Sequence, residues 1–488
     1  MFRTSVQNFE VAVLGGGMAG LATALRLQAA GLSTVVLEAH GHAGGCAGYF
    51  RHKGFSFDVG ATTLVDFEPG GVGGEFLETV GLGALNGERL PGYVAWLPDR
   101  KVTLYRDQRR WHEERLRSLG SSPGHVAFWA LLDRLAGVFW AASRNGIKLP
   151  IRTPQDLWAD LRALGAGNLP LARYLTWTLG DALRRFGLRQ EDALAGLLGM
   201  LVEDTVHSTV DRAPLINSAL GVTIRGAGLT RHHGGMHGFW KLLVSRYREL
   251  GGVLQAGCRV HRVEPGFIIS TNRGEWRARQ VVSSLPIAST AQICPMTTDR
   301  LRRFIKRDEP ELGGAVVAFL GVPQEEVAGQ DFTHHQLMQD YRRPLGEGNN
   351  MFVSVSAPDD LQSAPARHRA VMISTHTDLE GWDGPDYEQR KKELGEHLVR
   401  CAQRVYPHLG ERAVVYQVGT PRSYERFTWR PRGAVGGVRQ TLRNTNQLAV
   451  PHDIGIDGLW LVGDTTWPGL GTVACVLGSR IVAKGILR

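Results

Sequence analysis

The sequence predicts an α/β protein in which a Rossmann-like domain is interrupted by an inserted α+β domain with a mixed sheet and a helical cap. Three observations lead to this prediction. A strand–glycine loop–helix–strand pattern lies near the N-terminus, and a strand–loop–helix pattern lies at the C-terminus. The long region between them changes from helical to strand-like periodicity. The 488 residues are enough for two or more domains with sizeable cores.

The N-terminal pattern begins with an apolar run that predicts a buried parallel strand at residues 11–14. A helix is predicted at 18–30, where Gly31 takes the usual C-cap position. A second apolar strand, at 34–37, completes a β-α-β unit. Such a unit is the usual start of a Rossmann-like domain.

Three glycines and one acid in this unit predict a dinucleotide site. Gly15, Gly17 and Gly20 have G-x-G-x-x-G spacing. These glycines serve a tight turn, close approach of a pyrophosphate, and helix–strand packing. The helix N-terminus offers N–H groups to the phosphates, and Glu38 is placed to accept hydrogen bonds from a ribose. A ligand-free glycine turn is the alternative, and the complete register of strand, glycines, helix, strand and acid argues against it.

The net charge of +9 comes mostly from arginine. A generally basic surface is one interpretation, and attraction to anionic lipid head groups is another. We expect no nucleic-acid partner, because no basic–aromatic motif of a known binding module is present.

Five scattered cysteines form no C-x-x-C pair, which argues against a zinc site and a disulfide framework and fits a reducing cytoplasm. We expect no metal. The first ten residues are polar and too short for a signal peptide. No run of about 18 uninterrupted apolar residues occurs, so we expect a protein that is soluble or lies on a membrane surface.

The first part of the region between the two patterns, residues 101–230, has helical periodicity, clearest at 125–144 and 191–204. The segment 125–144 is rich in aromatic residues, which form a core more often than a membrane-dipping face. Both interpretations stay open for Phe128, Trp129, Phe139 and Trp140. We expect this block to belong to the inserted domain.

The remaining middle region predicts a return to the nucleotide-binding domain and then a sheet. Residues 231–300 predict a helix at 236–250 and two strands, the first of which holds Val260, whose backbone could meet an adenine edge. Residues 301–440 predict several strands followed by a helix at 387–404, which suits the floor of a ligand cavity. The predicted nucleotide-binding segments are 1–100, 231–300 and 441–488, and the inserted segments are 101–230 and 301–440.

The C-terminal pattern narrows the predicted cofactor to FAD. A strand at 459–462 is followed by Gly463 and Asp464, a Pro–Gly loop, and a helix that begins near Thr472. Asp464 can hold a ribityl or phosphate-proximal hydroxyl. The helix N-terminus after Gly471 can direct N–H groups at a flavin carbonyl that becomes negative on reduction. One more strand–loop–helix unit without that role is the alternative.

These patterns and three longer motifs resemble the phytoene desaturase, carotene isomerase and retinol saturase family of FAD-dependent enzymes. The motifs are AGGCAGYFRHKGFSFDVGATTL, GGMHGFWKLL and GLWLVGDTTWPGLGTVACVLGSRIVA, and the resemblance covers nearly the whole chain. Three further stretches are most similar to bacterial carotenoid 3,4-desaturases. They are DFEPGG, HHQL with GEGNNMFVSVSAPDD, and TPRSYERFTWRPRGAVGG.

The resemblance implies an FAD domain built from three separated segments beside a substrate domain with a long apolar tunnel. Relatives commonly carry arginine where this chain has Cys46, and Trp467 departs from their small-residue loop. Carried over to matching positions, the FAD-binding residues are Gly15, Gly17, Met18, Ala19, Gly20, Glu38, Ala39, Gly45, Cys46, Gly60, Ala61, Thr62, Val260, Gly463, Asp464, Gly471, Thr472 and Val473.

The implied activity is a C-3,4 desaturation near the end of an acyclic carotenoid such as lycopene or a 1-hydroxy derivative. Hydride would pass to the flavin, and a base or water would remove the neighbouring proton. Quinone or oxygen would reoxidise the flavin. Because substrate and quinone dissolve in membranes, we expect a cytoplasmic protein that docks on the inner face of the cell membrane.

Other functions remain as alternatives. Carotenoid cis–trans isomerisation and polyene saturation use the same flavin chemistry with a different outcome. An amine oxidase is less favoured, because no aromatic cage is evident beside the flavin loop. A flavin-free escort protein for prenylated partners would not need the complete FAD motif set.

The sequence does not identify the catalytic base. Two histidine pairs, His232–His233 and His334–His335, are candidates, although such doublets are more often in solvated loops. Glu203 and Asp204 end an apolar helix and could be polar groups near the cavity, although a surface helix end is the simpler interpretation.

Overall fold

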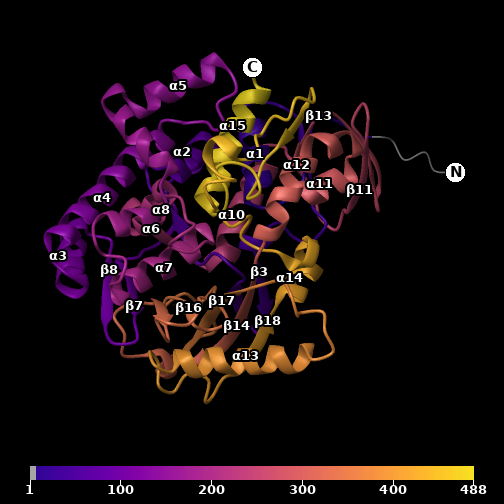
Figure 1. The fold of residues 1–488 in the computed structure, drawn as a ribbon. Coiled ribbons are helices and arrows are strands. Elements are labelled where there is room, and N and C mark those ends of the chain that lie inside the picture. The colour runs from indigo at the N-terminus through magenta and orange to yellow at the C-terminus, as the bar shows by residue number, and fades with distance from the viewer. Residues whose placement is uncertain (1–6) are drawn as a thin grey trace.

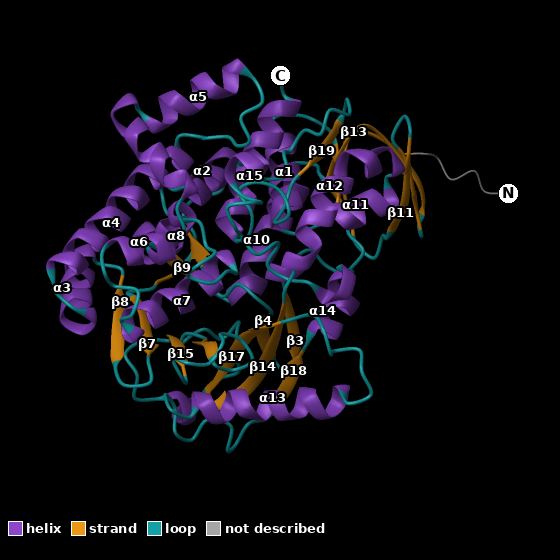
Figure 2. Cartoon of the chain, in the orientation of Figure 1, coloured by secondary structure: helices purple, strands orange, loops and turns teal. Residues whose placement is uncertain are grey.

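The computed structural model describes residues 7–488. The expectation about a signal peptide concerns residues 1–10, most of which lie outside the described range. Strands from three distant parts of the chain form the first sheet (Figures 1 and 2). Five strands pair in parallel, and the sheet continues through β12, which is antiparallel to β13, to β11, which is antiparallel to β12. The strands are β10 (Val253–Gln255), β2 (Thr34–Leu37), β1 (Gln7–Leu14), β13 (Gly274–Ser283), β19 (Leu459–Leu461), β12 (Ile268–Thr271) and β11 (Val260–Glu264).

Helices cover both faces of this sheet. Alternate residues of β1 enter two different cores, Val11 and Val13 on one face and Ala12 and Leu14 on the other. Burial on both faces explains why the strand reads as a continuous apolar run. The first face packs against α1 (Met18–Ala29), α2 (Val72–Thr79), α10 (Gly235–Glu249) and α15 (Thr472–Ile486), and the second against α11 (Ile287–Ile293) and α12 (Thr298–Asp308).

A second seven-stranded sheet lies beside the first unit, and α13 (Tyr387–Ala402) packs along its outer face (Figure 1). All neighbours are antiparallel except β15 and β7, which makes the sheet mixed, as expected. In spatial order the strands are β18 (Val415–Gly419), β14 (Gly314–Pro323), β17 (His368–Thr377), β16 (Asn350–Val355), β15 (His334–Met338), β7 (Gly92–Trp96) and β8 (Lys101–Tyr105). The hairpin β7–β8 therefore joins this sheet although the predicted boundary at residue 100 cuts through it.

Helices between β8 and β9 form a cap with its own core. They are α3 (Gln108–Leu119), α4 (Pro123–Arg144), α5 (Pro154–Leu164), η2 (Ala166–Thr176), α6 (Leu179–Arg185), α7 (Asp192–Val206), α8 (Leu215–Val222) and α9 (Ile224–Ala227). Within residues 7–488, α4 alone has the length and apolar composition of a membrane-crossing helix. Of its aromatic residues, Phe128 and Trp129 are buried in the cap core, and Phe139 and Trp140 are half-buried and line a cavity.

Short elements connect these units. They are β3 (Tyr49–His52) and β4 (Phe55–Asp58), a three-stranded sheet of β5 (Leu64–Val65), β9 (Leu229–His232) and β6 (Gly87–Arg89), and α14 (Pro421–Thr428). All five cysteines are free, in agreement with the expectation that none forms a disulfide.

Candidate functional site

A cavity of about 1110 Å³ is lined by residues of the first sheet, the cap and the second sheet. Every residue predicted to bind FAD lines it except Gly20. Gly20 instead faces the polypeptide: a Cβ there would meet the carbonyl oxygen of Gly15 and lie 2.6 Å from Ser284 Oγ. Gly20 therefore serves helix–strand packing, the role that the motif assigns to its last glycine.

Two glycine loops pack against each other at one end of the cavity. Gly15 adopts φ +95°, and a Cβ on Gly17 would have only the Cα of Gly45, 4.0 Å away, within reach. The Gly44 amide donates to the carbonyl oxygen of Gly16 at 3.0 Å. Gly44 and Gly45 therefore allow their loop to approach the loop of Gly15–Gly17 closely, while Gly17 stays open to the cavity.

Glu38 lies where the sequence predicts a ribose ligand. Its Oε2 accepts a hydrogen bond from the Gly16 amide at 2.6 Å, and its Oε1 accepts one from the His40 amide at 2.7 Å. Burial raises the pKa of Glu38 against the effect of these two amides. Val260, at the start of β11, lines the cavity as well.

Two helices direct their N-termini into the same cavity. Helix α1 follows Gly17, α15 follows Gly471, and neither has a side-chain N-cap or an acid in its first turn. Gly471 adopts φ +101°, and no atom lies within 4 Å of the position of its absent Cβ. Two uncapped N-termini form a site suited to anionic groups.

An arginine that sequence reasoning missed lies beside Asp464. Arg430 Nη1 is 3.0 Å from Asp464 Oδ2 and Nη2 is 3.1 Å from Oδ1. Burial lowers the pKa of Arg430, but Asp464 and Cys46 outweigh it and raise the value. Burial likewise raises the pKa of the Cys46 thiol, which Arg430 partly offsets. Arg430 thus places a cation beside both Cys46 and Asp464.

A buried ion pair supports the predicted Gly60–Thr62 turn. Arg231 Nη1 lies 2.9 Å from Asp58 Oδ2 and 3.2 Å from the carbonyl oxygen of Thr62. Asp58 Oδ1 also accepts from the Met236 amide at 2.7 Å, at the start of α10. The pair joins residues 173 apart in the chain, so no local pattern could have revealed it.

None of the four histidines proposed as bases lines the cavity. His232 is half-buried and His233 is exposed. His334 and His335 are fully buried in β15, so their assignment to a solvated loop was wrong. His334 Nε2 lies 3.3 Å from Thr62 Oγ1, and His335 contacts Trp96 and Tyr406. His334 and His335 therefore serve the packing of the second sheet.

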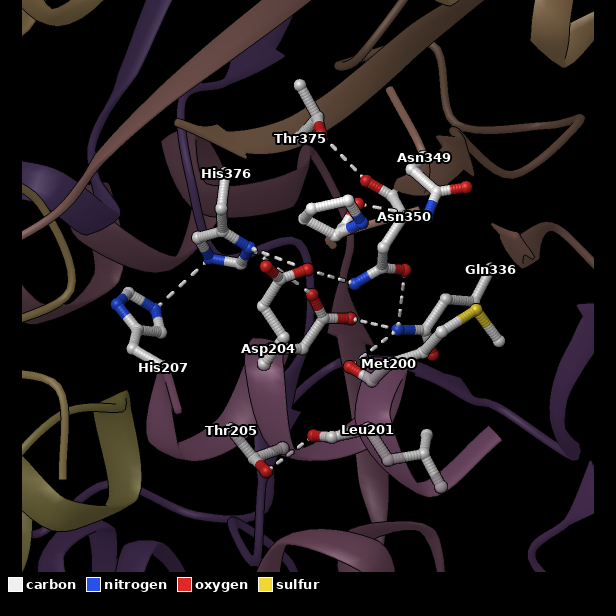
Figure 3. Close-up of polar contacts among 12 residues, drawn as sticks. Met200, Leu201, Asp204, Thr205, His207, Gln336, Asn349, Asn350, Thr375 and His376 are labelled. Carbon is white, nitrogen blue, oxygen red and sulfur yellow. Dashed lines mark hydrogen bonds and ion pairs between the residues drawn. The ribbon is translucent and has the colours of Figure 1, made fainter. Parts of the chain in front are cut away.

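A polar cluster instead occupies the wall formed by α7 and β17 (Figure 3). Asp204 from α7, His207 directly after the end of α7, and His376 from β17 line the cavity. Of the two interpretations of Asp204, the position near the cavity is therefore the correct one. Burial raises the pKa of Asp204 to about 7, with a contribution from Glu203. Burial lowers the pKa of His207 well below its usual value. For His376, Glu203 and Asp204 outweigh burial and raise the pKa.

The rest of this side of the cavity is largely apolar. Phe139, Trp140, Ile216, Leu220, Ile224 and Leu175 contribute to its walls. Leu175 is also 42% exposed, so the cavity reaches the surface at η2. Among residues 7–488, no group of three or more His, Cys, Asp or Glu side chains could hold a metal ion. The arrangement offers a nucleotide end and an adjoining apolar chamber.

Comparison with known proteins gives a consistent result over nearly the whole chain. Residues 13–79 match the NAD(P)-binding Rossmann-like domain. The chain is 24% identical to the prolycopene isomerase of Daucus carota, over 98% of this chain and 80% of that protein. It is 21% identical to the 4,4'-diapophytoene desaturase of Staphylococcus aureus, over 98% of this chain and 99% of that protein.

Solved structures share the fold at low sequence identity. A putrescine oxidase triple mutant aligns with TM-score 0.65 and 15% identity over 99% of both chains. An oxidoreductase from Methanosarcina mazei aligns with TM-score 0.63 and 18% identity, covering 97% of this chain and 100% of that one. A fatty acid isomerase from P. acnes aligns with TM-score 0.60 and 15% identity over 98% of both.

Proposed function

Because this chain is an oxidoreductase of the carotenoid desaturase and isomerase family, we propose that it binds FAD and acts on a long acyclic polyene of the carotenoid class. The observation that carries this proposal is one cavity that combines a dinucleotide cradle with an apolar chamber. The cradle explains the cofactor, and the chamber suits a substrate that has few polar groups.

The residues of the cradle fit FAD. Gly17 leaves room for a pyrophosphate at the N-terminus of α1, where a side chain would project into the cavity. Glu38 presents a carboxylate for the adenosine ribose, and Val260 lies close enough to line the adenine end. Asp464 and the N-terminus of α15 would face the ribityl chain and the ring. When bound there, FAD would supply a two-electron acceptor for an allylic hydride.

Within this class we propose C-3,4 desaturation near the chain end, supported by the motifs shared with bacterial 3,4-desaturases. The chain would position the polyene end beside the ring, and the polyene itself would delocalise developing charge. Cis–trans isomerisation is the second candidate, favoured by the relationship to prolycopene isomerases. Saturation would need the reverse redox step. The amine oxidase likeness is one of fold alone.

Expression in cells that accumulate lycopene or 1-hydroxy-lycopene separates these outcomes. A desaturase lengthens the conjugated system and shifts absorption to longer wavelength, whereas an isomerase changes geometry without changing conjugation. The purified protein should carry, or take up, FAD with its visible absorbance. Protein that fails to bind FAD and leaves all polyenes unchanged would refute the proposal.

We further propose that the cavity opens against a lipid surface on the inner face of the cell membrane. Exposed apolar side chains gather on α5 and η2, which are in contact: Leu157, Trp158, Leu169 and Leu175, with Trp158 73% exposed. Arg162 and Arg173 are exposed on the same elements, so the patch combines apolar anchors with positive charge. Quinone in the membrane, or oxygen, would then reoxidise the cofactor.

Vesicle sedimentation tests this surface. Trp158→Ser should reduce binding to anionic phospholipid vesicles and leave FAD binding unchanged, because Trp158 does not line the cavity. Leu361→Ser, at a 70% exposed leucine that is neither on α5 or η2 nor in the cavity lining, serves as the control for vesicle binding. Equal vesicle binding of the wild type and Trp158→Ser would contradict the assignment of this patch.

A further inference from the structure

Asp204 stands out because it places a carboxylate in a chamber that is otherwise suited to a polyene. The residue lies in the last turn of α7, whose buried side chains are mostly apolar. Its side chain is 28% exposed, and that exposed part lines the cavity. Burying a carboxylate in apolar surroundings costs free energy unless it is paired. A position that required only packing would be filled at lower cost by an apolar residue.

The two oxygens of Asp204 have different surroundings (Figure 3). Oδ2 accepts a hydrogen bond from Gln336 Nε2 at 2.7 Å. Gln336 is itself fixed, because the same nitrogen donates to the carbonyl oxygen of Met200 at 3.0 Å. Oδ1 lies 3.8 Å from His376 Nδ1 and has no closer polar partner among the described residues. One oxygen is thus held in place, and the other is free to exchange a proton.

Two imidazoles continue from this carboxylate toward the cofactor end. His376 Nε2 lies 3.2 Å from His207 Nε2, so one ring donates a hydrogen bond to the other. His207 packs against Gly436, and the next glycine, Gly437, packs against the carbonyl group of Asp464. The direction of the two pKa shifts makes His376 the proton-rich ring and His207 the neutral one.

We propose that Asp204 is the base that takes the proton from the substrate carbon, and that His376 stabilises the carboxylate form of Asp204 from 3.8 Å away. The inference rests on the proposed function and assigns the base that the sequence left open. One of the two carbons that form the new double bond loses its C–H proton to Asp204 Oδ1. The electron pair of that C–H bond forms the C=C bond, while the other of the two carbons loses hydride to the flavin. The carboxylate becomes a carboxylic acid, which returns its proton to water at the mouth of the cavity before the next turnover.

The neighbouring acid does not fit this role. Glu203 does not line the cavity, and its Oε2 accepts a hydrogen bond from Asn350 Nδ2 at 2.6 Å. It also lies 3.8 Å from His376 Nδ1. Glu203 therefore acts on the electrostatics of the pair and not on the substrate.

The test compares Asp204→Asn with a matched control, Asp308→Asn. Asp308 is also a buried aspartate with a raised pKa, and it lies on α12, outside the cavity lining and away from the proposed docking patch on α5 and η2. Both variants are loaded with FAD and given lycopene in liposomes. We expect Asp204→Asn to bind FAD normally and to lose about 100-fold or more in turnover, the usual contribution of a general base. Asp308→Asn should keep wild-type turnover.

The pH profile of the wild type gives an independent readout. Turnover should rise with pH through a midpoint near 7, because only the carboxylate form accepts a proton. The groups that face Asp204 and set this midpoint are Glu203, His376, Arg225 and Tyr93, and His207 and Arg439 act through His376. The apparent pKa therefore belongs to the cluster.

The outcomes are distinguishable. Wild-type protein without activity on any polyene overturns the proposed function. Active wild type together with full activity of Asp204→Asn overturns the assignment of the base. If Asp204→Asn does not fold, a flat wild-type profile between pH 6 and 8 overturns it instead.

Discussion

Gly20→Ala should lower the stability of the fold, whereas Gly17→Ala should weaken cofactor binding, although both glycines belong to one motif. Gly20 lies inside α1, and a Cβ there would overlap the carbonyl oxygen of Gly15 and lie 2.6 Å from Ser284 Oγ. Overpacking of this kind costs about 1–3 kcal/mol, at the upper end here because backbone must move. The helix propensity of alanine returns about 0.5–1 kcal/mol. Gly20→Ala should therefore destabilise the apoprotein by about 2 kcal/mol.

Gly17→Ala should leave the apoprotein nearly unchanged. Gly17 has φ −76°, which any residue can adopt, and the added Cβ would lie 4.0 Å from the Cα of Gly45. That methyl group would occupy the space proposed for the pyrophosphate. A clash of about 1–3 kcal/mol corresponds to a Kd for FAD that is roughly fivefold to 150-fold weaker.

Thermal unfolding of the apoprotein and titration with FAD, followed by flavin fluorescence, measure the two effects separately. The Tm should fall for Gly20→Ala and stay within error for Gly17→Ala, whereas the Kd should rise strongly for Gly17→Ala. Wild-type FAD affinity in Gly17→Ala would show that this loop is not the pyrophosphate cradle. An unchanged Tm in Gly20→Ala would refute the packing argument.

Two further substitutions test the electrostatics of the cavity. Arg430→Gln leaves Asp464, whose side chain is 17% exposed, without its cation; the loss of stability should be at most the about 3–5 kcal/mol that breaking a fully buried pair costs. The double substitution Arg430→Gln/Asp464→Asn should recover part of the lost Tm, and no recovery would argue against a direct pair. Asp204→Asn should increase the free energy of unfolding at pH 8 by at most about 4 kcal/mol relative to wild type, with a smaller increase at pH 5. The Tm should rise accordingly. The folded pKa lies above the unfolded one, so wild-type stability falls as pH rises from about 4 to about 7; a constant Tm difference between pH 5 and pH 8 would contradict this.

Local patterns predicted most of the first unit correctly. The strand predicted at 34–37 coincides with β2, and the helix predicted at 18–30 ends one residue early as α1. These elements follow from apolar periodicity and from glycines with fixed conformational roles, which are properties of short segments. For the same reason, the predicted FAD residues other than Gly20 were gathered around one cavity.

Local patterns failed where a residue's role depends on a distant partner. The segment HHQL has the composition of a polar loop. It forms part of β15, however, and because β15 lies between β16 and β7, His334 and His335 are completely buried. Pairing with distant strands overrides the polarity of a short segment. Arg430 likewise gains its role only through contact with Asp464, which is 34 residues away.

The sequence by itself determined the β-α-β unit, the glycine cradle and the return of the chain to the first sheet, because spacing within each segment specifies them. Only the tertiary structure decided which polar groups share the cavity. Asp204 ends a cap helix and His376 lies on a strand of the second sheet, and the packing of α7 against that sheet brings them within 3.8 Å. Proton chemistry depends on such distances, and no spacing within one segment of the chain encodes them.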